Sequence, residues 1–131
     1  GENQTVNQGD IVMTVVPQGN QRIIGRSEIT MRGAGRVIPG RQVLIKLDAY
    51  PYLQYGVIEG IIENVSLAAQ DEIYIVDIEL PNGLRTSTGE ELKFTHNMSG
   101  RAEIVTDKLR LIERIIEPFR HIINRNRILA Q

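Results

Sequence analysis

The side chains that could do acid–base, nucleophilic or metal chemistry are few in this chain and lie far apart. His96 and His121 are the only histidines among 131 residues, and neither has a second ligand at the spacing of a metal site. Cysteine is absent, which removes disulfides, thiolate chemistry and cysteine-type zinc sites. No serine lies in a Gly-x-Ser-x-Gly turn, and the adjacent acids Glu90 and Glu91 are typical of a solvated loop. We therefore expect no enzyme activity, no metal site and no cofactor.

A glycine-rich stretch, Gly33-Ala-Gly35, looks at first like the start of a phosphate-binding loop. The dinucleotide pattern requires a third glycine at position 38, where Ile38 stands. A helix should then follow, but Pro39-Gly40 predicts a type II turn instead. We interpret the stretch as a loop between two strands.

Aromatic residues are rare, yet Tyr50, Tyr52 and Tyr55 fall together in the stretch DAYPYLQYG, residues 48–56. On an extended strand the first two rings would point to one side, with Pro51 removing a backbone donor between them. Such rings could form a stacking platform for a sugar or an oligonucleotide, or close the end of a β-barrel with their hydroxyls in water. A net charge of −1 gives no basic surround for nucleic acid, so we favour the structural interpretation and expect no nucleic-acid partner.

The segments that would position these residues have the period of β-strands. Apolar and polar residues alternate over short runs, and the runs are separated by glycine, proline and asparagine turns such as Asn82-Gly83, the commonest short-hairpin pair. Strands are expected around residues 11–16, 22–31, 43–48, 57–67, 74–80 and 101–105. Gly60, inside the fourth run, suits a bulge or a sharp bend. The pattern predicts a mostly β fold, a small antiparallel barrel or sandwich.

The last segment, residues 107–131, changes to the period of a helix. Leu109, Ile112, Ile116 and Phe119 fall on one apolar arc, and charged residues fill the other. This amphipathic helix carries six Lys/Arg and three Asp/Glu. Its apolar arc could pack on its own barrel, dock on a partner or lie at a membrane surface.

The order of these elements resembles one protein family. Residues 9–17 (GDIVMTVVP), 37–52 (VIPGRQVLIKLDAYPY), 55–60 (YGVIEG) and 100–106 (GRAEIVT) follow the pattern of the C-terminal part of the HlyD-type membrane fusion proteins. The resemblance extends over roughly residues 9–120, and the stretch around DAYPYLQYG is its most specific part. It implies that residues 1–20 end a lipoyl-like domain, 21–106 form a β-barrel of about six strands, and 107–131 form the C-terminal helix.

The family also implies a function without chemistry. Its members are periplasmic adaptors of type I and ABC-driven export, anchored by an N-terminal helix and linking an inner-membrane transporter to an outer-membrane channel. The channel contact belongs to a coiled-coil hairpin, which together with the anchor is expected outside this chain. The resemblance leaves the barrel to contact the transporter and other adaptor copies. Candidate docking residues are Tyr50, Tyr52, Tyr55, Leu109, Ile112, Ile116 and Phe119. The alternative is a free-standing barrel that binds a sugar or an oligonucleotide through the three tyrosines.

Overall fold

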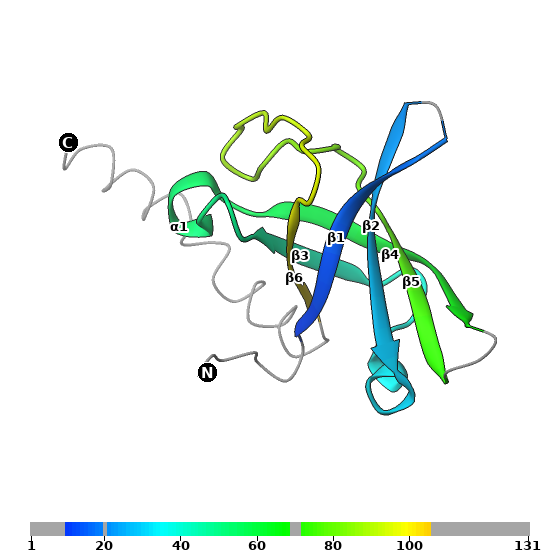
Figure 1. Ribbon diagram of the computed structural model, residues 1–131. Coiled ribbons are helices and arrows are strands. Elements are labelled where there is room, and N and C mark those ends of the chain that lie inside the picture. Colours follow the sequence, from blue (N-terminus) through cyan, green and yellow to red (C-terminus); the bar gives the residue numbers. More distant parts are fainter. Residues whose placement is uncertain (1–9, 20, 69–71, 106–131) are drawn as a thin grey trace.

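The computed structural model describes residues 10–19, 21–68 and 72–105, in which six antiparallel strands close into a barrel (Figure 1). The strands are β1 (Asp10–Gln18), β2 (Arg22–Thr30), β3 (Gln42–Leu47), β4 (Ile58–Leu67), β5 (Ile73–Glu79) and β6 (Ser99–Ile104). Their order around the barrel is β1-β2-β5-β4-β3-β6. The prediction of a mostly β fold with a small antiparallel barrel is confirmed.

Alternating side chains fill the inside of the barrel, as the sequence pattern requires. In β1 the residues Ile11, Met13 and Val15 are buried, while Val12 between them is exposed. Bulky side chains from the other strands meet them in one continuous core, chiefly Ile29, Val43, Ile45, Leu47, Ile58, Ile62, Val76, Ile78, Ala102 and Ile104. Burial of this apolar surface is the main stabilising contribution to the fold.

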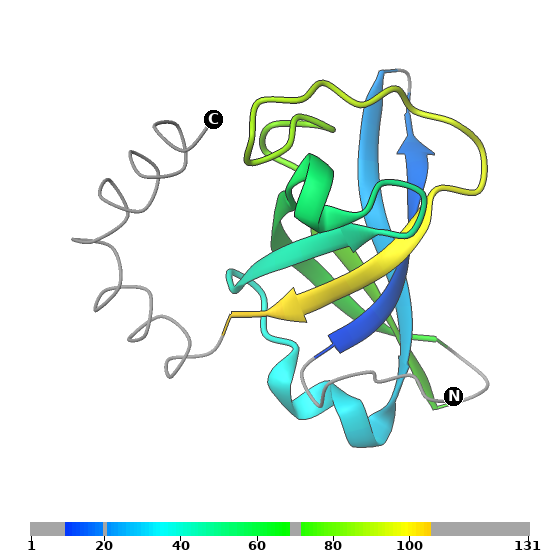
Figure 2. The same cartoon turned by 90° about the vertical axis from the view of Figure 1, so that its left-hand side faces the viewer.

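Each end of the barrel is covered by a segment of chain outside the strands (Figures 1 and 2). The 3₁₀ helix η1 (Met31–Arg36) follows β2 at one end, where Ala34 and the neighbouring Val37 pack against the core. The long connection from β5 to β6 covers the other end and contributes Leu84 and Met98 to the core. The Gly33-Ala-Gly35 stretch is therefore part of a connection between two strands, as expected.

The barrel begins at Asp10 and not at residue 21. Residues 14–18 of β1 pair with residues 22–26 of β2, and residues 10–14 pair with residues 99–103 of β6. β1 thus lies between β2 and β6 and closes the sheet, so the part of the 1–20 range that the structure describes belongs to the barrel. The sequence shows that β1 has one apolar face, but it does not show which sheet buries that face.

Two expectations about local structure are also corrected. Gly60 is paired in register with Val43, and the irregularity in β4 lies between Ile62 and Asn64. Gly60 faces the core, where a Cβ would lie 2.6 Å from Cγ2 of Ile78, so the glycine provides room rather than a bulge. Asn82-Gly83 makes a turn within the β5–β6 connection, not a two-residue hairpin.

The amphipathic helix expected over residues 107–131 lies outside the described residues. The last described residue is Val105, whose N–H donates to the carbonyl oxygen of Gln42 at 2.9 Å. The helix stays a prediction from the sequence.

A substitution at Gly100 tests how closely β6 approaches β3. We expect Gly100→Ala to lower the free energy of unfolding by about 1–3 kcal/mol. A Cβ there would collide with the carbonyl oxygen of Lys46 and lie 2.8 Å from Cα of Leu47, and backbone atoms cannot move aside as a flexible side chain can. Gly35→Ala is the matched control, since a Cβ there meets nothing within 4 Å, and we expect a change within about 0.5 kcal/mol. Urea unfolding measures both variants, and equal stability would contradict the close approach.

Candidate functional site

The tyrosine-rich stretch forms a short helix at one end of the barrel, not an extended strand. β3 ends at Leu47, a turn follows, and α1 (Tyr52–Tyr55) begins directly after Pro51. The N–H groups of Gln54 and Tyr55 both donate to the carbonyl oxygen of Pro51, at 3.0 and 2.9 Å. Proline suits the start of a helix because its fixed φ is near the helical value and no N–H is lost from the helix. The prediction of an extended Tyr50–Tyr52 segment was wrong because it ignored this use of proline.

The helical turn places Tyr50 and Tyr55 in contact with each other and Tyr52 against Lys46. Tyr50 is half-buried against the core, and its ring lies 5.2 Å from that of Tyr55 in an edge-to-face arrangement with an interplanar angle of 85°. Tyr52 is 46% exposed and lies with its ring 4.6 Å from Nζ of Lys46. The rings therefore do not form a row of parallel faces on which bases could stack. The arrangement supports the structural interpretation for Tyr50 and leaves Tyr52 on the surface.

The β5–β6 connection fastens α1 to the barrel. Thr88 Oγ1 donates to the carbonyl oxygen of Tyr55 at 2.8 Å, and Ser87 Oγ accepts from the N–H of Val57 at 3.1 Å. The N–H of Ser87 in turn donates to the carbonyl oxygen of Val57 at 2.9 Å. Gly56 has a φ of 90° and leaves too little room for a Cβ beside Ser87. These contacts hold a short helix that would not form in isolation.

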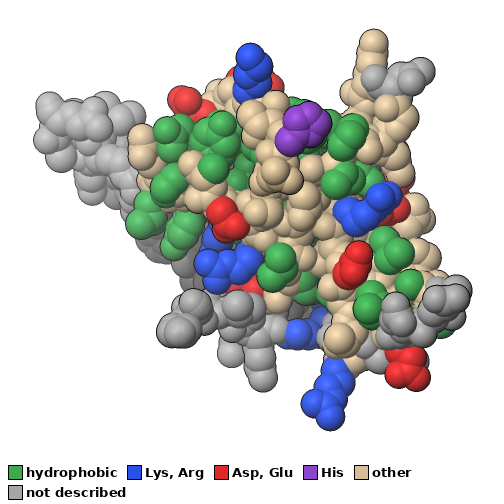
Figure 3. Space-filling view, viewed as in Figure 1, with side chains coloured by type: hydrophobic (Ala, Val, Ile, Leu, Met, Phe, Trp, Pro, Cys, Tyr) green, Lys and Arg blue, Asp and Glu red, His purple; other side chains and the backbone are tan. Residues whose placement is uncertain are grey.

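The exposed side chains of α1 form an apolar surface that we name the α1 patch, made of Tyr52 and Leu53. Leu53 is 88% exposed, and none of the residues of α1 is buried. Hydrophobic side chains gather on this side of the molecule in the space-filling view, where Figure 1 places α1 (Figure 3). Exposed apolar side chains that lie together, here Tyr52 and Leu53, are a common feature of interaction sites. The sequence analysis missed Leu53, because its exposure depends on the helical turn that was not predicted.

Charged residues beside the α1 patch are mostly paired. Lys46 Nζ lies 3.3 Å from Oε1 of Glu103 and also contacts the ring of Tyr52. Together with Pro51 and Tyr52, a set of charged side chains lines an open groove of about 340 Å³ over β1, β6 and β3, namely Asp10, Lys46, Asp48 and Arg101. Both signs of charge are present, so this surface does not provide the basic field that nucleic-acid binding requires.

Other candidate groups do not come together within the described part of the chain. His96 is exposed in a turn with its ring 6.0 Å from that of Phe94, and no group of three potential metal ligands occurs among the described residues. Within the same ranges, no helix is long and apolar enough to cross a bilayer. Leu109, Ile112, Ile116 and Phe119, like His121, lie outside the described residues.

The two interpretations of the tyrosines predict different effects on stability. We expect Tyr50→Ala to lower the free energy of unfolding by about 1–3 kcal/mol, less than for a fully buried ring, because Tyr50 is half-buried. Tyr52→Ala should cost about 0.5–1 kcal/mol, since it removes an exposed ring that contacts Lys46. Thermal or urea unfolding compares the two. A larger effect for Tyr52 than for Tyr50 would reverse our assignment.

The link between α1 and the β5–β6 connection can be tested separately. Thr88→Val keeps the shape of the side chain but removes the donor to Tyr55, so we expect a loss of about 0.5–1.5 kcal/mol. Amide hydrogen exchange should accelerate at Gly56, whose N–H donates to Tyr52. Thr30→Val, exposed at the end of β2, is the matched control. Unchanged exchange at Gly56 would show that Thr88 does not hold α1.

Comparison with known proteins identifies relatives along nearly the whole chain. The leukotoxin export protein LtxD of Aggregatibacter actinomycetemcomitans is 26% identical in an alignment 126 residues long that covers 92% of this chain and 26% of the relative. The plasmid hemolysin secretion protein D of Escherichia coli is 22% identical in an alignment 122 residues long that covers 89% of this chain and 25% of the relative. Protein CyaD of Bordetella pertussis is 30% identical in an alignment 112 residues long that covers 82% of this chain and 25% of the relative.

The chain spans about a quarter of the length of these curated relatives. No family model matches it, and no solved structure matches it significantly. The matched proteins are HlyD-type secretion proteins, and they cover both the barrel and the stretch around α1. By the match of its sequence to these proteins along 82% to 92% of its length, the chain belongs to the family of HlyD-type membrane fusion proteins.

Proposed function

We propose that this chain is the docking barrel of a bacterial export adaptor, which acts through protein contacts and not through chemistry. The observation that carries the proposal is Leu53, an apolar side chain 88% exposed on a helix that Ser87 and Thr88 hold in place. The names of the relatives, an export protein and a secretion protein, support a role in export. The barrel would provide a rigid base for a contact made at its end.

In this proposal the partner at the α1 patch is the periplasmic surface of an inner-membrane ABC-type transporter. The parent protein would be anchored in that membrane and would reach an outer-membrane channel through parts outside this chain. Other adaptor copies would lie beside it. An apolar anchor surrounded by charged side chains of both signs is the usual composition of a protein–protein contact with a hydrophobic centre and a polar rim.

The apolar residues of the last segment form a second part of the proposal. Leu109, Ile112, Ile116 and Phe119 are proposed as docking residues from their helical spacing alone. Their contribution can be separated from that of α1 because the two sets lie in different segments of the chain.

The proposal predicts that Leu53→Asp abolishes export without unfolding the barrel. In the full-length parent protein we expect export to fall at least about tenfold, because a charge at the centre of an apolar contact costs 2 kcal/mol or more. The free energy of unfolding of the 131-residue chain should change by less than about 0.5 kcal/mol, since Leu53 is exposed. Secretion assays, and crosslinking from position 53 to the transporter, measure the effect.

Leu67→Asp is the matched control, because Leu67 is also an exposed leucine but lies at the end of β4, away from α1. It should leave export unchanged. Wild-type export by Leu53→Asp, or equal losses from both variants, would contradict docking through the α1 patch.

A further inference from the structure

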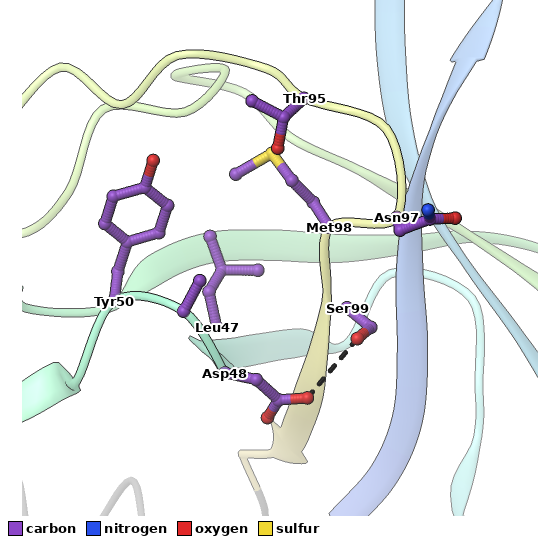
Figure 4. Close-up of a pocket in the computed structure, with 8 residues that line it drawn as sticks. Leu47, Asp48, Tyr50, Thr95, Asn97, Met98 and Ser99 are labelled. Carbon is purple, nitrogen blue, oxygen red and sulfur yellow. Dashed lines mark hydrogen bonds between the residues drawn. The ribbon is translucent and has the colours of Figure 1, made fainter.

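A small pocket lies beside α1, between the end of β3 and the residues that lead into β6 (Figure 4). Its volume is about 80 Å³, which is close to the space of two or three water molecules or of the end of one side chain. We name it the Asp48 pocket. Its lining residues are Leu47, Asp48, Ala49, Tyr50, Thr95, Asn97, Met98 and Ser99.

Half of the lining is apolar, from Leu47, Ala49, Tyr50 and Met98, and the uncharged polar part comes from Thr95, Asn97 and Ser99; the one charged lining group is the carboxylate of Asp48. Figure 4 shows the ring of Tyr50 on one side, the thioether of Met98 on the other and Leu47 between them, with Asp48 below. Leu47 and Met98 are buried in the core, whereas Asp48 is exposed. The shape and chemistry thus fit a ligand that has an apolar stem and a cationic end.

The backbone holds the two walls in place. The N–H of Asp48 donates to the carbonyl oxygen of Ser99 at 2.9 Å, and the N–H of Val15 donates to that of Met98 at 2.7 Å. Ser99 Oγ also donates to Oδ2 of Asp48 at 3.3 Å, which fixes the direction of the carboxylate. A carboxylate accepts several hydrogen bonds, so one from Ser99 leaves acceptor positions open.

No ion pair joins Asp48 to another side chain among residues 10–19, 21–68 and 72–105. Lys46 lies two residues earlier, but its Nζ contacts Glu103 at 3.3 Å and the ring of Tyr52. Asp10, Lys46 and Arg101 line the adjoining groove, which Asp48 also lines. Of these four charged side chains, only Asp48 also lines the pocket.

We propose that the Asp48 pocket binds the basic side chain of a docking protein, a lysine or an arginine whose stem lies between Tyr50 and Met98 and whose charged end reaches Asp48. The inference rests on the proposed function, since it adds a charged contact next to the apolar contact of Leu53. An isolated ion pair at a solvent-exposed surface contributes little to the binding free energy. A hydrogen-bonded ion pair whose side-chain stem is also packed fixes the position of the partner.

The chemistry of the pocket is tested on the 131-residue chain alone, with n-butylammonium as the probe. We expect saturable NMR shift changes at the methyl groups of Leu47 and Met98, with a dissociation constant in the millimolar range that a ligand of this size allows. In the Asp48→Asn variant the affinity for n-butylammonium should fall about tenfold, because one charge-assisted hydrogen bond is lost. n-Butanol at the same concentration is the neutral control, and Glu28→Gln on β2 is the control for removal of a remote acid.

Equal responses to n-butylammonium and n-butanol, or equal affinity in Asp48→Asn and the original chain, would overturn the cation site. This measurement does not involve a transporter, so its failure is distinct from failure of the docking role. Export by the full-length protein tests the partner: Asp48→Asn should reduce it and Glu28→Gln should not. If Asp48→Asn loses the probe but exports normally, the pocket binds cations without serving the docking contact, and the proposal is wrong.

Discussion

The close approach of β6 to β3 at Gly100 is the constraint on which this end of the molecule depends. Gly100 lies against the backbone of Lys46 and Leu47, where no larger residue fits without movement. This contact brings Ser99 to Asp48 and places the start of β6 beside the end of β3. The turn that leads into α1 begins at this point. The absence of a side chain at position 100 thus contributes to the positions of both the α1 patch and the Asp48 pocket.

Rigidity at this end comes from two connections that hold one another. The β5–β6 connection contributes Leu84 and Met98 to the core, and these buried side chains hold its backbone against the barrel. Its hydroxyl groups at Ser87 and Thr88 then bind the backbone around α1. Because α1 has no buried residue of its own, the position of Leu53 depends on these hydrogen bonds and on Tyr50. A side chain held outward in this way loses little conformational freedom when a partner binds it.

The sequence predicted the strands well and their arrangement less well. Apolar residues at alternate positions predict a strand with one buried face, as in β3 and β5, whereas β2 buries Ile24 and Gly25 in succession. Which strands pair is a long-range property, and for that reason β1 was placed outside the barrel that it closes. The sequence indicated a structural role for Gly60. The reason that glycine is needed there, the proximity of Ile78, is visible only in three dimensions.

The candidate site was predicted only in part, because its surface also depends on contacts between segments far apart in the chain. The concentration of tyrosines in DAYPYLQYG was visible, and so was the importance of Pro51. Proline can end a strand or begin a helix, and the sequence did not decide between these roles. That choice alone determines whether Tyr52 stands beside Tyr50 or over Lys46, and whether Leu53 is a core residue or an exposed one. Local pattern therefore located the tyrosine-rich stretch, while the surface that the stretch presents depends on how the β5–β6 connection folds over it.

At this end of the barrel the packed side chains and the exposed side chains belong to different residues. The core is formed by inward side chains of six strands, and neither Leu53 nor Asp48 belongs to it. Changes at these two positions can therefore alter binding with little effect on folding, because exposed substitutions seldom change stability by much. The residues that hold them, Gly100 and Tyr50, have the opposite character, since each is packed against the barrel. The residues that stabilise this end of the barrel and the residues that it exposes are thus neighbours but separate, so that an exposed side chain of α1 can be exchanged with little cost to the fold.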